Sequence, residues 1–312
     1  MPRLRVAVIG CGRMGRERLR SARACGAEIA GVYDMDPHRA READAPLLTG
    51  PNDLRRRAFD AVFVCTPPSE RAAYALAAIQ TGSALFVEKP IGPSSVAVAA
   101  ITEALALTPV LTGVGYMNRY RRSVQCAARV LGGRQVIGAA GFWVCRRYSV
   151  PWWLDPAASG GPHNEQATHL YDLCRHVIGE VEEVRALFHA PAVTGPPLAA
   201  ATAVRFVSGG TGTLFYSCQA TAKDIGLRVF TTTGSLFLSG WDLRLAENTI
   251  DGTLVAEADA EDIFLTETAA FLDAVATGDG SRIRSNWSDA LRTQALVDAA
   301  AASVVRGAAH AA

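Results

Sequence analysis

The sequence predicts an α/β fold with two domains: a doubly wound parallel sheet at the N-terminus, followed by an α+β domain with a large, open, mainly antiparallel sheet. Strand and helix patterns alternate up to about residue 120 and then stop. Beyond that point, apolar runs are separated by glycine pairs and polar turns, as in antiparallel sheets. We therefore expect domains at residues 1–120 and 121–312, with C-terminal helices that can pack back on the first domain.

A glycine-rich turn follows the first expected strand. Leu4–Ile9 is a β-branched run typical of a buried strand, and a helical pattern extends to about Cys25. Between them, Gly10 permits a tight turn, Gly12 lets the backbone approach a pyrophosphate, and Gly15 lets the helix pack on the strand. Backbone N–H groups at the helix start would face the anion, so the turn predicts a Rossmann domain. The expected cofactor contacts here are Gly10, Cys11, Gly12, Arg13, Met14 and Gly15.

The second expected strand, Glu28–Tyr33, ends in Asp34, about 20 residues after the third glycine. An acid at this place accepts hydrogen bonds from a ribose 2′-hydroxyl and repels a 2′-phosphate, which favours NAD. His38 and Arg39 follow closely and leave NADP open. The alternatives are a nucleotide-free α/β domain, which the Asp34 spacing disfavours, and a SAM-binding methyltransferase, which the third glycine and the later motifs disfavour.

The alternation continues along the first domain. Strands are expected at Asp60–Cys65, Ala84–Val87 and Pro109–Val114, and helices at about Ser69–Thr81 and Ser94–Leu107. Ligands bind at the carboxyl ends of parallel strands. We therefore expect the residues that follow two of these strands to rim the cofactor cleft, and the candidates are Thr66, Pro67, Glu88 and Lys89.

Lys89 is one of only two lysines in the chain, and the other is Lys223; every other basic side chain apart from histidine is arginine. Arginine stays protonated in proteins, whereas a buried lysine can lose its proton. A lysine at a strand end is therefore a candidate for proton transfer or for polarising a substrate oxygen. A structural salt bridge with a neighbour such as Glu88 is the alternative.

A polar stretch, Ser159–His176, lies where an apolar helix would be expected. As an α-helix it would align Glu165, His169, Asp172 and His176 on one face, and we expect this face to line a reaction chamber. His169 is the first choice for general acid and base, because imidazole titrates near neutral pH. A metal site built from His163, Glu165, His169 and His176 is a disfavoured alternative, suggested by side chains that can ligate a metal at helical spacing.

The second domain contains the remaining expected elements. A linking helix is expected at Arg121–Leu131, a long strand at Gln135–Arg147, further strands near 203–207, 212–217, 227–231 and 235–238, and helices at 269–276 and 288–305. Trp152 and Trp153 either stack on a sugar ring or fill the junction of sheet and helix. An open sheet with one uncovered face would need a partner, so we expect a homodimer or homotetramer through that face.

Composition limits the partners and the compartment. The formal net charge of +1 argues against a nucleic-acid partner. The sequence has no run of about 18 apolar residues, so we expect no membrane span. The seven cysteines are dispersed without a Cys-x-x-Cys pair, which is typical of reduced cytoplasmic thiols. We therefore expect a cytoplasmic protein with a small-molecule substrate.

Several motifs in chain order carry a family resemblance. They are Gly10-x-Gly-x-x-Gly15, Asp34, Cys65-Thr-Pro-Pro68, Glu88-Lys-Pro90, Gly115-Tyr-Met-Asn-Arg-Tyr120 and Gly160-Gly161 with Glu165, His169 and Asp172. The chain resembles the glucose–fructose oxidoreductase, inositol dehydrogenase and MocA-like family. The resemblance implies hydride transfer between a nicotinamide cofactor and a sugar or cyclitol carbon. It also implies that Lys89 and His169 contact the reacting carbinol, which makes both of them candidates for catalysis and for substrate binding.

Other roles follow from this scheme. Lys89 would stabilise alkoxide character on the oxygen whose proton His169 takes. Glu165 would orient the substrate or tune His169, and Asp172 could hold the imidazole tautomer. Asn118, Arg119 and Trp153 are further substrate-binding candidates.

The chain departs from the family pattern at two positions. Glu165 stands where Asp is usual, and Arg71 stands where His is frequent, so no role is assigned to Arg71. A non-catalytic NAD(P)-binding sensor or scaffold on the same fold is the alternative function. The presence of both Lys89 and His169 disfavours it.

Overall fold

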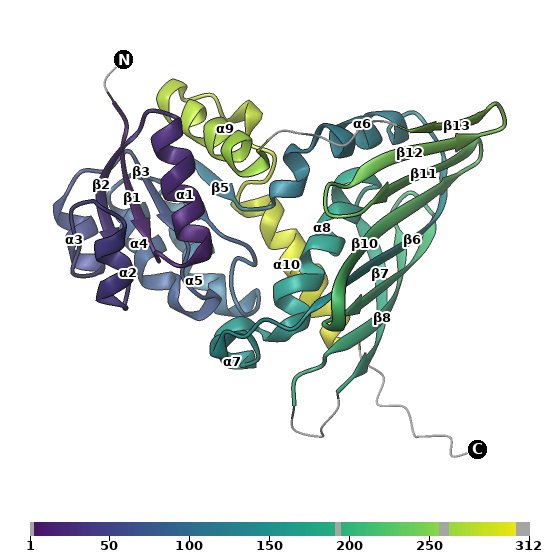
Figure 1. Cartoon of the computed structure of the whole chain (residues 1–312), viewed down its shortest axis with the longest axis horizontal. Coiled ribbons are helices and arrows are strands. Elements are labelled where there is room, and N and C mark those ends of the chain that lie inside the picture. Colours follow the sequence, from purple (N-terminus) through teal and green to yellow (C-terminus); the bar gives the residue numbers. More distant parts are fainter. Residues whose placement is uncertain (1–2, 191–194, 256–261, 304–312) are drawn as a thin grey trace. The chain divides into compact units, whose positions relative to one another are not determined.

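The computed structural model describes residues 3–190, 195–255 and 262–303, which form two compact units (Figure 1). The first unit comprises Met1–Tyr120, Ala157–Ser159 and Glu261–Leu291. The second unit comprises Arg121–Pro156, Gly160–Ala260 and Arg292–Ala312. The predicted fold class is confirmed, because one unit contains a parallel sheet and the other a large, mainly antiparallel sheet.

The first unit is built on a five-stranded parallel sheet in the order β2-β1-β3-β4-β5. Its strands are β1 (Arg5–Ile9), β2 (Glu28–Tyr33), β3 (Ala61–Val64), β4 (Ala84–Val87) and β5 (Thr112–Val114). Its helices are α1 (Arg13–Ala24), α2 (Pro37–Glu42), α3 (Pro51–Arg56), α4 (Ala72–Gln80), α5 (Ala99–Leu107) and α9 (Ile263–Thr277). Every residue of β3 and β4 is buried, which explains why both strands are continuous apolar runs.

Strand order reverses beside β1, because the chain leaves β2 on one side and returns as β3 on the other. This switch point is where open α/β sheets bind ligands. Short 3₁₀ segments follow the strands, at Pro68–Glu70, Val96–Val98 and Met117–Tyr120, and another lies at Gly280–Arg282. The helix expected from Ser69 is therefore a 3₁₀ turn followed by α4, with Arg71 between them.

Other differences from the predicted first-domain elements are local. Pro109 to Leu111 lie outside β5, which is only three residues long. The short helices α2 and α3 were not predicted, and each begins with a proline, a residue that suits the first helical turn. The predicted C-terminal helix at 269–276 is part of α9, which belongs to the first unit and packs against α1.

The second unit contains an eight-stranded sheet in the order β13-β12-β11-β10-β6-β9-β8-β7. Its strands are β6 (Val136–Arg146), β7 (Val181–His189), β8 (Ala199–Phe206), β9 (Thr211–Ser217), β10 (Gln219–Thr231), β11 (Gly234–Ser239), β12 (Arg244–Thr249) and β13 (Gly252–Val255). All neighbouring strands are antiparallel except β6 and β9, which are parallel. Strands β7, β12 and β13 were not predicted.

Helices cover one face of this sheet. They include α6 (Arg122–Leu131), α8 (Thr168–Val177) and the second part of α10 (Trp287–Ala302), and a 3₁₀ turn lies at Pro151–Trp153. The short helix α7 (Pro156–Ser159) belongs almost wholly to the first unit. Residues 304 and 305 of the expected last helix lie outside the described residues. Gly141 of β6 lets α8 approach closely, because a Cβ there would lie 2.9 Å from Leu170 Cδ1.

The polar stretch Ser159–His176 is not a single α-helix, in contrast to the prediction. His163–Ala167 is a π-helix, and the α-helix begins only at Thr168. A π-helix has more residues per turn than an α-helix, so the predicted α-helical alignment of Glu165 with His169 is wrong. His169, Asp172 and His176 do belong to one α-helix. Gly160 and Gly161 precede the π-helix with positive φ angles of 77° and 85°, a conformation that favours glycine.

No helix among the described residues is long and apolar enough to cross a membrane. All seven cysteines are free thiols. Burial raises the pKa of the thiols at Cys65 and Cys174 above their ordinary value, so both remain protonated near neutral pH.

Candidate functional site

Two glycines of the turn after β1 are required by the packing of the first unit. Gly10 has a φ of +88° and its N–H donates to Tyr33 O at 2.7 Å. A Cβ on Gly10 would lie 2.8 Å from the backbone carbon of Cys65, and a Cβ on Gly15 would lie 1.7 Å from Gly10 O. These positions therefore exclude any larger residue for reasons internal to the protein.

Gly12 differs from the other two glycines. No described atom lies within 4 Å of a Cβ placed on it, so the packing of the chain gives no reason for a glycine here. Gly12 is also the N-cap of α1, and its cap makes no side-chain hydrogen bond. No side chain therefore caps the first N–H groups of α1. The space beside them, where a Cβ of residue 12 would lie, holds no other atom of the described chain. This arrangement fits the pyrophosphate of a dinucleotide.

Asp34 follows β2 and fixes the turn from the other side. One carboxylate oxygen accepts a hydrogen bond from the Cys11 N–H at 2.7 Å, and the other accepts from the Asp36 N–H at 2.8 Å. Each oxygen has a second lone pair, so the half-buried carboxylate can still accept from a ribose hydroxyl. Burial and the nearby Asp34 raise the pKa of the Cys11 thiol to about 11. Cys11 can therefore contact a cofactor through its backbone while its side chain stays a neutral thiol.

The remaining residues of the glycine turn and the end of β3 complete this edge. Arg13 is exposed and Met14 is half-buried in the first turn of α1. Thr66 and Pro67 follow β3 and are both half-buried. The Thr66 hydroxyl oxygen is buried and has no hydrogen-bond partner among the described residues. A buried hydroxyl without a partner is costly, which marks this position for a ligand group.

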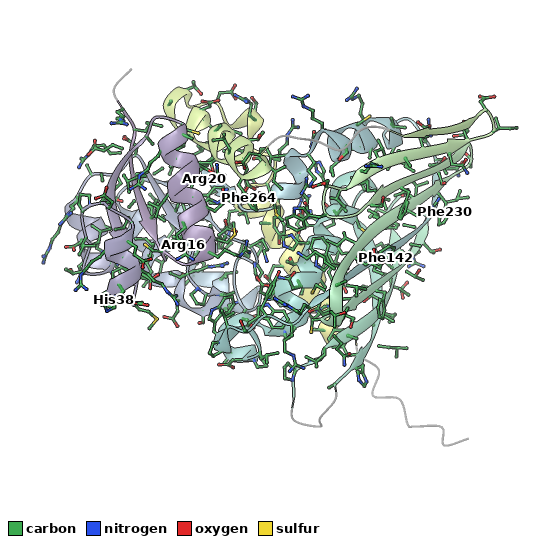
Figure 2. The ribbon with its side chains drawn as sticks, in the orientation of Figure 1. Arg16, Arg20, His38, Phe142, Phe230 and Phe264 are labelled. Carbon is green, nitrogen blue, oxygen red and sulfur yellow. The ribbon has the colours of Figure 1, made fainter. Side chains whose placement is uncertain are left out.

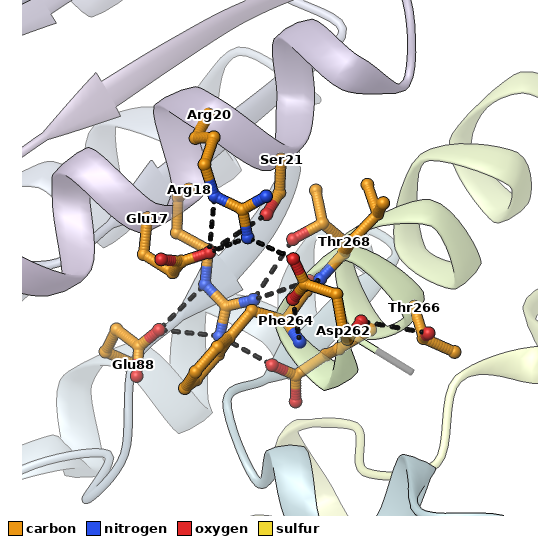
Figure 3. A network of polar contacts seen from close by, with 11 residues as sticks. Glu17, Arg18, Arg20, Ser21, Glu88, Asp262, Phe264, Thr266 and Thr268 are labelled. Carbon is orange, nitrogen blue, oxygen red and sulfur yellow. Dashed lines mark hydrogen bonds and ion pairs between the residues drawn. The ribbon is translucent and has the colours of Figure 1, made fainter. Parts of the chain in front are cut away.

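Glu88 directly follows β4, as predicted, and its side chain is buried. Its carboxylate accepts hydrogen bonds from Arg18, at 2.8 Å from Nε and 2.7 Å from Nη2, and the same Nη2 lies 2.5 Å from a carboxylate oxygen of Glu267 (Figure 3). Arg18 and Glu267 are completely buried and Glu88 is 4% exposed. Gly115 makes room for the carboxylate, because a Cβ there would lie 2.7 Å from Glu88 Oε2. The Glu88 side chain is therefore part of a buried ion cluster, and a contact between Glu88 and the cofactor stays a prediction.

Arg18 was missed by the sequence reasoning, although a signal was present. It lies on the same face of α1 as the buried residues Gly15, Leu19 and Ala22. A charged residue on the apolar face of a helix indicates a buried partner. Arg18 Nη1 also donates to the Thr268 hydroxyl at 3.1 Å, and its guanidinium lies 4.4 Å from the centre of the Phe86 ring.

Lys89 follows directly and is half-buried at the end of β4, with a cis peptide bond to Pro90. Asn118 and Arg119, in the 3₁₀ segment after β5, are both 4% exposed. Arg119 donates to the backbone oxygen of Arg284 at 2.8 Å and pairs with Asp289 at 2.8 Å. Arg119 thus links the segment after β5 to residues 284 and 289 of the same unit, and its role in substrate binding stays a prediction.

In the second unit, His169 stacks on the face of Trp143. The two ring centres lie 4.8 Å apart, and the rings are inclined by only 15°. Trp143 is fixed in turn, because its indole N–H donates to Gln166 Oε1 at 3.2 Å. Both rings are buried, with 1% of Trp143 and 5% of His169 exposed. The imidazole plane is thus set by an aromatic side chain of the sheet.

Glu165 is held by two donors. Trp153 Nε1 donates to its carboxylate at 2.9 Å, and the Gln166 amide donates to the same oxygen. Trp153 itself is completely buried in the core of the second unit. The expectation that Trp153 binds substrate is therefore corrected, because it is an internal residue that orients Glu165.

The other polar residues of this stretch have structural partners. Asp172 accepts a hydrogen bond from the Thr293 hydroxyl at 3.1 Å. His163 and Tyr171 hydrogen-bond at 3.1 Å, and burial lowers the pKa of His163 to about 4, so it is neutral at pH 7. His176 lies 3.0 Å from the Gln125 amide. Within the described ranges, no group of three His, Cys, Asp or Glu residues is placed to hold a metal ion.

Fold and site together define a dinucleotide-binding α/β protein with a second, sheet-bearing unit. The family profile described as "Oxidoreductase family, NAD-binding Rossmann fold" matches residues 4–116, and the "GFO/IDH/MocA C-terminal domain" matches residues 133–237. The chain therefore belongs to the Gfo/Idh/MocA oxidoreductase family, and its first unit is an NAD-binding Rossmann domain. The resemblance and the choice of NAD as cofactor are confirmed.

Two curated relatives are dehydrogenases of cyclitols. Inositol 2-dehydrogenase of Burkholderia multivorans is 33% identical over 143 residues, which cover 43% of this chain and 42% of that enzyme. The scyllo-inositol 2-dehydrogenase (NAD(+)) of Bacillus subtilis is 28% identical over 255 residues, which cover 75% of this chain and 73% of that enzyme. The match to the Burkholderia enzyme thus spans less than half of its length.

Solved structures share the fold over nearly the whole chain. UDP-N-acetylglucosamine 3-dehydrogenase from Acidithiobacillus ferrooxidans has a TM-score of 0.85 at 21% identity, covering 97% of this chain and 98% of that one. A levoglucosan dehydrogenase in complex with NADH and L-sorbose has a TM-score of 0.86 at 19% identity, covering 97% of both chains. At these identities the comparison establishes the fold alone.

Gly12 and Gly15 should respond differently to alanine. We expect Gly12→Ala to fold with a free energy of unfolding within about 1 kcal/mol of the wild type, because its new methyl group meets no described atom. The same variant should weaken NADH binding at least about tenfold, because the methyl group occupies the space of the pyrophosphate. Urea unfolding and NADH fluorescence titration measure the two effects.

Gly15→Ala is the matched control. Its methyl group would meet Gly10 O, so we expect a loss of more than about 2 kcal/mol in unfolding free energy. Unchanged NADH affinity in Gly12→Ala would show that the dinucleotide does not lie against this turn.

Proposed function

We propose that this protein is an NAD(P)-dependent oxidoreductase that transfers a hydride between nicotinamide and a hydroxyl or keto carbon of a sugar, cyclitol or related polyol. The proposal depends mainly on the empty space beside Gly12 at the start of α1. No described atom of the chain fills this space, and the N–H groups of the helix start can bind the pyrophosphate of a dinucleotide there. The substrate class is supported by the relatives, whose names place them among inositol and sugar dehydrogenases.

The two units would divide the work. In this proposal residues 1–120 bind the cofactor, whereas residues 121–312 bind the substrate and make the subunit contact. Asp34 favours NAD over NADP, because its carboxylate accepts from a ribose hydroxyl and repels a 2′-phosphate. The nicotinamide, when bound, accepts or donates the hydride.

The chain's own residues would handle the proton. Lys89 donates a hydrogen bond to the reacting oxygen and stabilises its alkoxide character. His169 takes the proton during oxidation and returns it during reduction. Glu165 acts through orientation, since it is fixed by Trp153 and Gln166. Asp172 holds α8 through Thr293 and thereby the position of His169 one turn earlier.

A polyol and sugar panel with NAD and NADP tests the proposal. We expect turnover of at least one cyclitol or sugar, and a loss of about 100-fold or more in kcat/KM for Lys89→Met and for His169→Gln, as for a missing proton-transfer group. Lys223→Met, which removes the only other lysine, is the matched control and should stay within about twofold. The sensor or scaffold alternative would be favoured if the protein binds NADH but turns over no substrate, and if neither Lys89→Met nor His169→Gln changes NADH binding.

The open sheet face supports an oligomer. Strand β6 alternates, so that Trp143 faces the helices while Phe142 lies on the other side, where Figure 2 labels it together with Phe230. A depression of about 610 Å³ on the sheet is lined by Phe142, Phe215 and Phe237 among other residues. Phe215 is 44% exposed. We propose that a second copy of the chain covers this face and that the protein functions in the cytoplasm without a nucleic-acid or membrane partner.

Sedimentation velocity tests the subunit contact. The wild type should sediment as a dimer or tetramer, and Phe215→Glu should shift it to the monomer, because the variant places a charge on the covered face. Ile250→Glu is the control, since Ile250 is 98% exposed in the turn before β13. A wild type that is monomeric at micromolar concentration would refute this part of the proposal.

A further inference from the structure

Arg71 lies between the ends of two neighbouring strands of the parallel sheet. It occupies the junction between the 3₁₀ turn Pro68–Glu70 and α4 and is only 3% exposed. Its Nε and Nη2 donate to Thr66 O at 3.1 and 3.0 Å, which is the carbonyl just beyond β3. Its Nη1 donates to Glu88 O and to Pro90 O, just beyond β4. One side chain therefore binds both strand ends.

These contacts enclose Lys89. The backbone carbonyls of Glu88, the residue before Lys89, and of Pro90, the residue after it, both accept hydrogen bonds from Arg71 Nη1. The carboxylate of Glu88 is held separately by Arg18. The residue that precedes Lys89 is thus fixed through its backbone by one arginine and through its side chain by another. Lys89 is left half-buried on a backbone that is restrained on both flanks.

Only arginine has the geometry for this position. A guanidinium is planar and presents its N–H donors in a rigid fork, so it can reach carbonyls on both sides at once. Lysine would bring the charge but only a single donor atom, and a neutral imidazole would bring a single N–H. A buried charge is also costly unless it is hydrogen-bonded. The three carbonyl acceptors offset this cost for the Arg71 guanidinium.

We propose that Arg71 is the positioning residue for Lys89: it fixes the turn of residues 88–90 against the end of β3, so that the ammonium group meets the reacting oxygen in the geometry required for transfer. The inference rests on the proposed function of Lys89 and extends it to a residue that acts through the backbone on either side of Lys89. A displacement of about 1 Å at a reacting group can reduce a rate about 100-fold, so a rigid clamp has a kinetic effect.

Steady-state kinetics of Arg71→Lys and Arg71→Met test the clamp. We expect kcat to fall at least about tenfold in Arg71→Lys and further in Arg71→Met. The KM for NAD and the NADH dissociation constant should rise by a clearly smaller factor, because Arg71 also binds the carbonyl of Thr66, a candidate cofactor contact. Arg55→Met is the matched control, because Arg55 is an exposed arginine on α3 that bonds Gln80 and Asn52. Methylguanidinium should partly restore kcat to Arg71→Ala, and methylammonium should not. Unchanged kcat in Arg71→Lys, or equal losses in kcat and NADH affinity, would overturn the inference.

Hydrogen exchange gives a readout that needs no turnover. Peptides that cover residues 60–70 and 84–95 should exchange faster in Arg71→Lys, while the rest of the first unit exchanges as in the wild type. Uniformly faster exchange, or no change in these peptides, would overturn the clamp whatever the kinetics. If the wild type turns over no substrate, the proposed function fails, and the local exchange result alone decides whether Arg71 restrains the turn around Lys89.

Discussion

The first unit depends on the buried ion cluster of Arg18, Glu88 and Glu267. These residues come from α1, the end of β4 and α9, and Arg18 and Glu267 are 249 positions apart in the chain. Burial of each ion costs several kcal/mol in lost hydration, which the attraction between the partners offsets. Removal of one partner would therefore lower the free energy of unfolding by about 3–5 kcal/mol. The cluster ties α9 to the N-terminal sheet. It also fixes the residue before Lys89, so the stability of the unit and the placement of its candidate catalytic lysine share one interaction (Figure 3).

The second unit uses a different means of positioning. Trp143 sets the plane of His169 by stacking, and the Gln166 amide links the Trp143 indole to the Glu165 carboxylate. These contacts are short-range and aromatic, with few charges, and they lie on the helix-covered face of the sheet. In the polar stretch, the side chains of Glu165, Gln166 and Asp172 are thus held by partners of the second unit. Such a network favours a fixed orientation of the imidazole over adaptability.

Much of the fold and part of the site could be read from the residues. The glycine turn, Asp34 and the apolar runs of β3 and β4 depend on local patterns, and these predictions agree with the structure. Strand β7 was missed because charged residues such as Glu182, Glu183 and Arg185 face solvent between its apolar ones. The π-helix was missed because its residue types do not differ from those of an α-helix. Arg18 was missed as a site residue because its partners lie far away in the chain.

In the proposed reaction, a hydride passes between the carbon of a polyol or sugar and the nicotinamide. Deuterium transfer tests it directly. A substrate deuterated at the reacting carbon is incubated with NAD, and the reduced cofactor is examined by NMR and mass spectrometry. We expect one deuterium at nicotinamide C4, on one face of the ring, together with a slower rate for the deuterated substrate. Formation of NADH without deuterium at C4, when the substrate is oxidised, would contradict it.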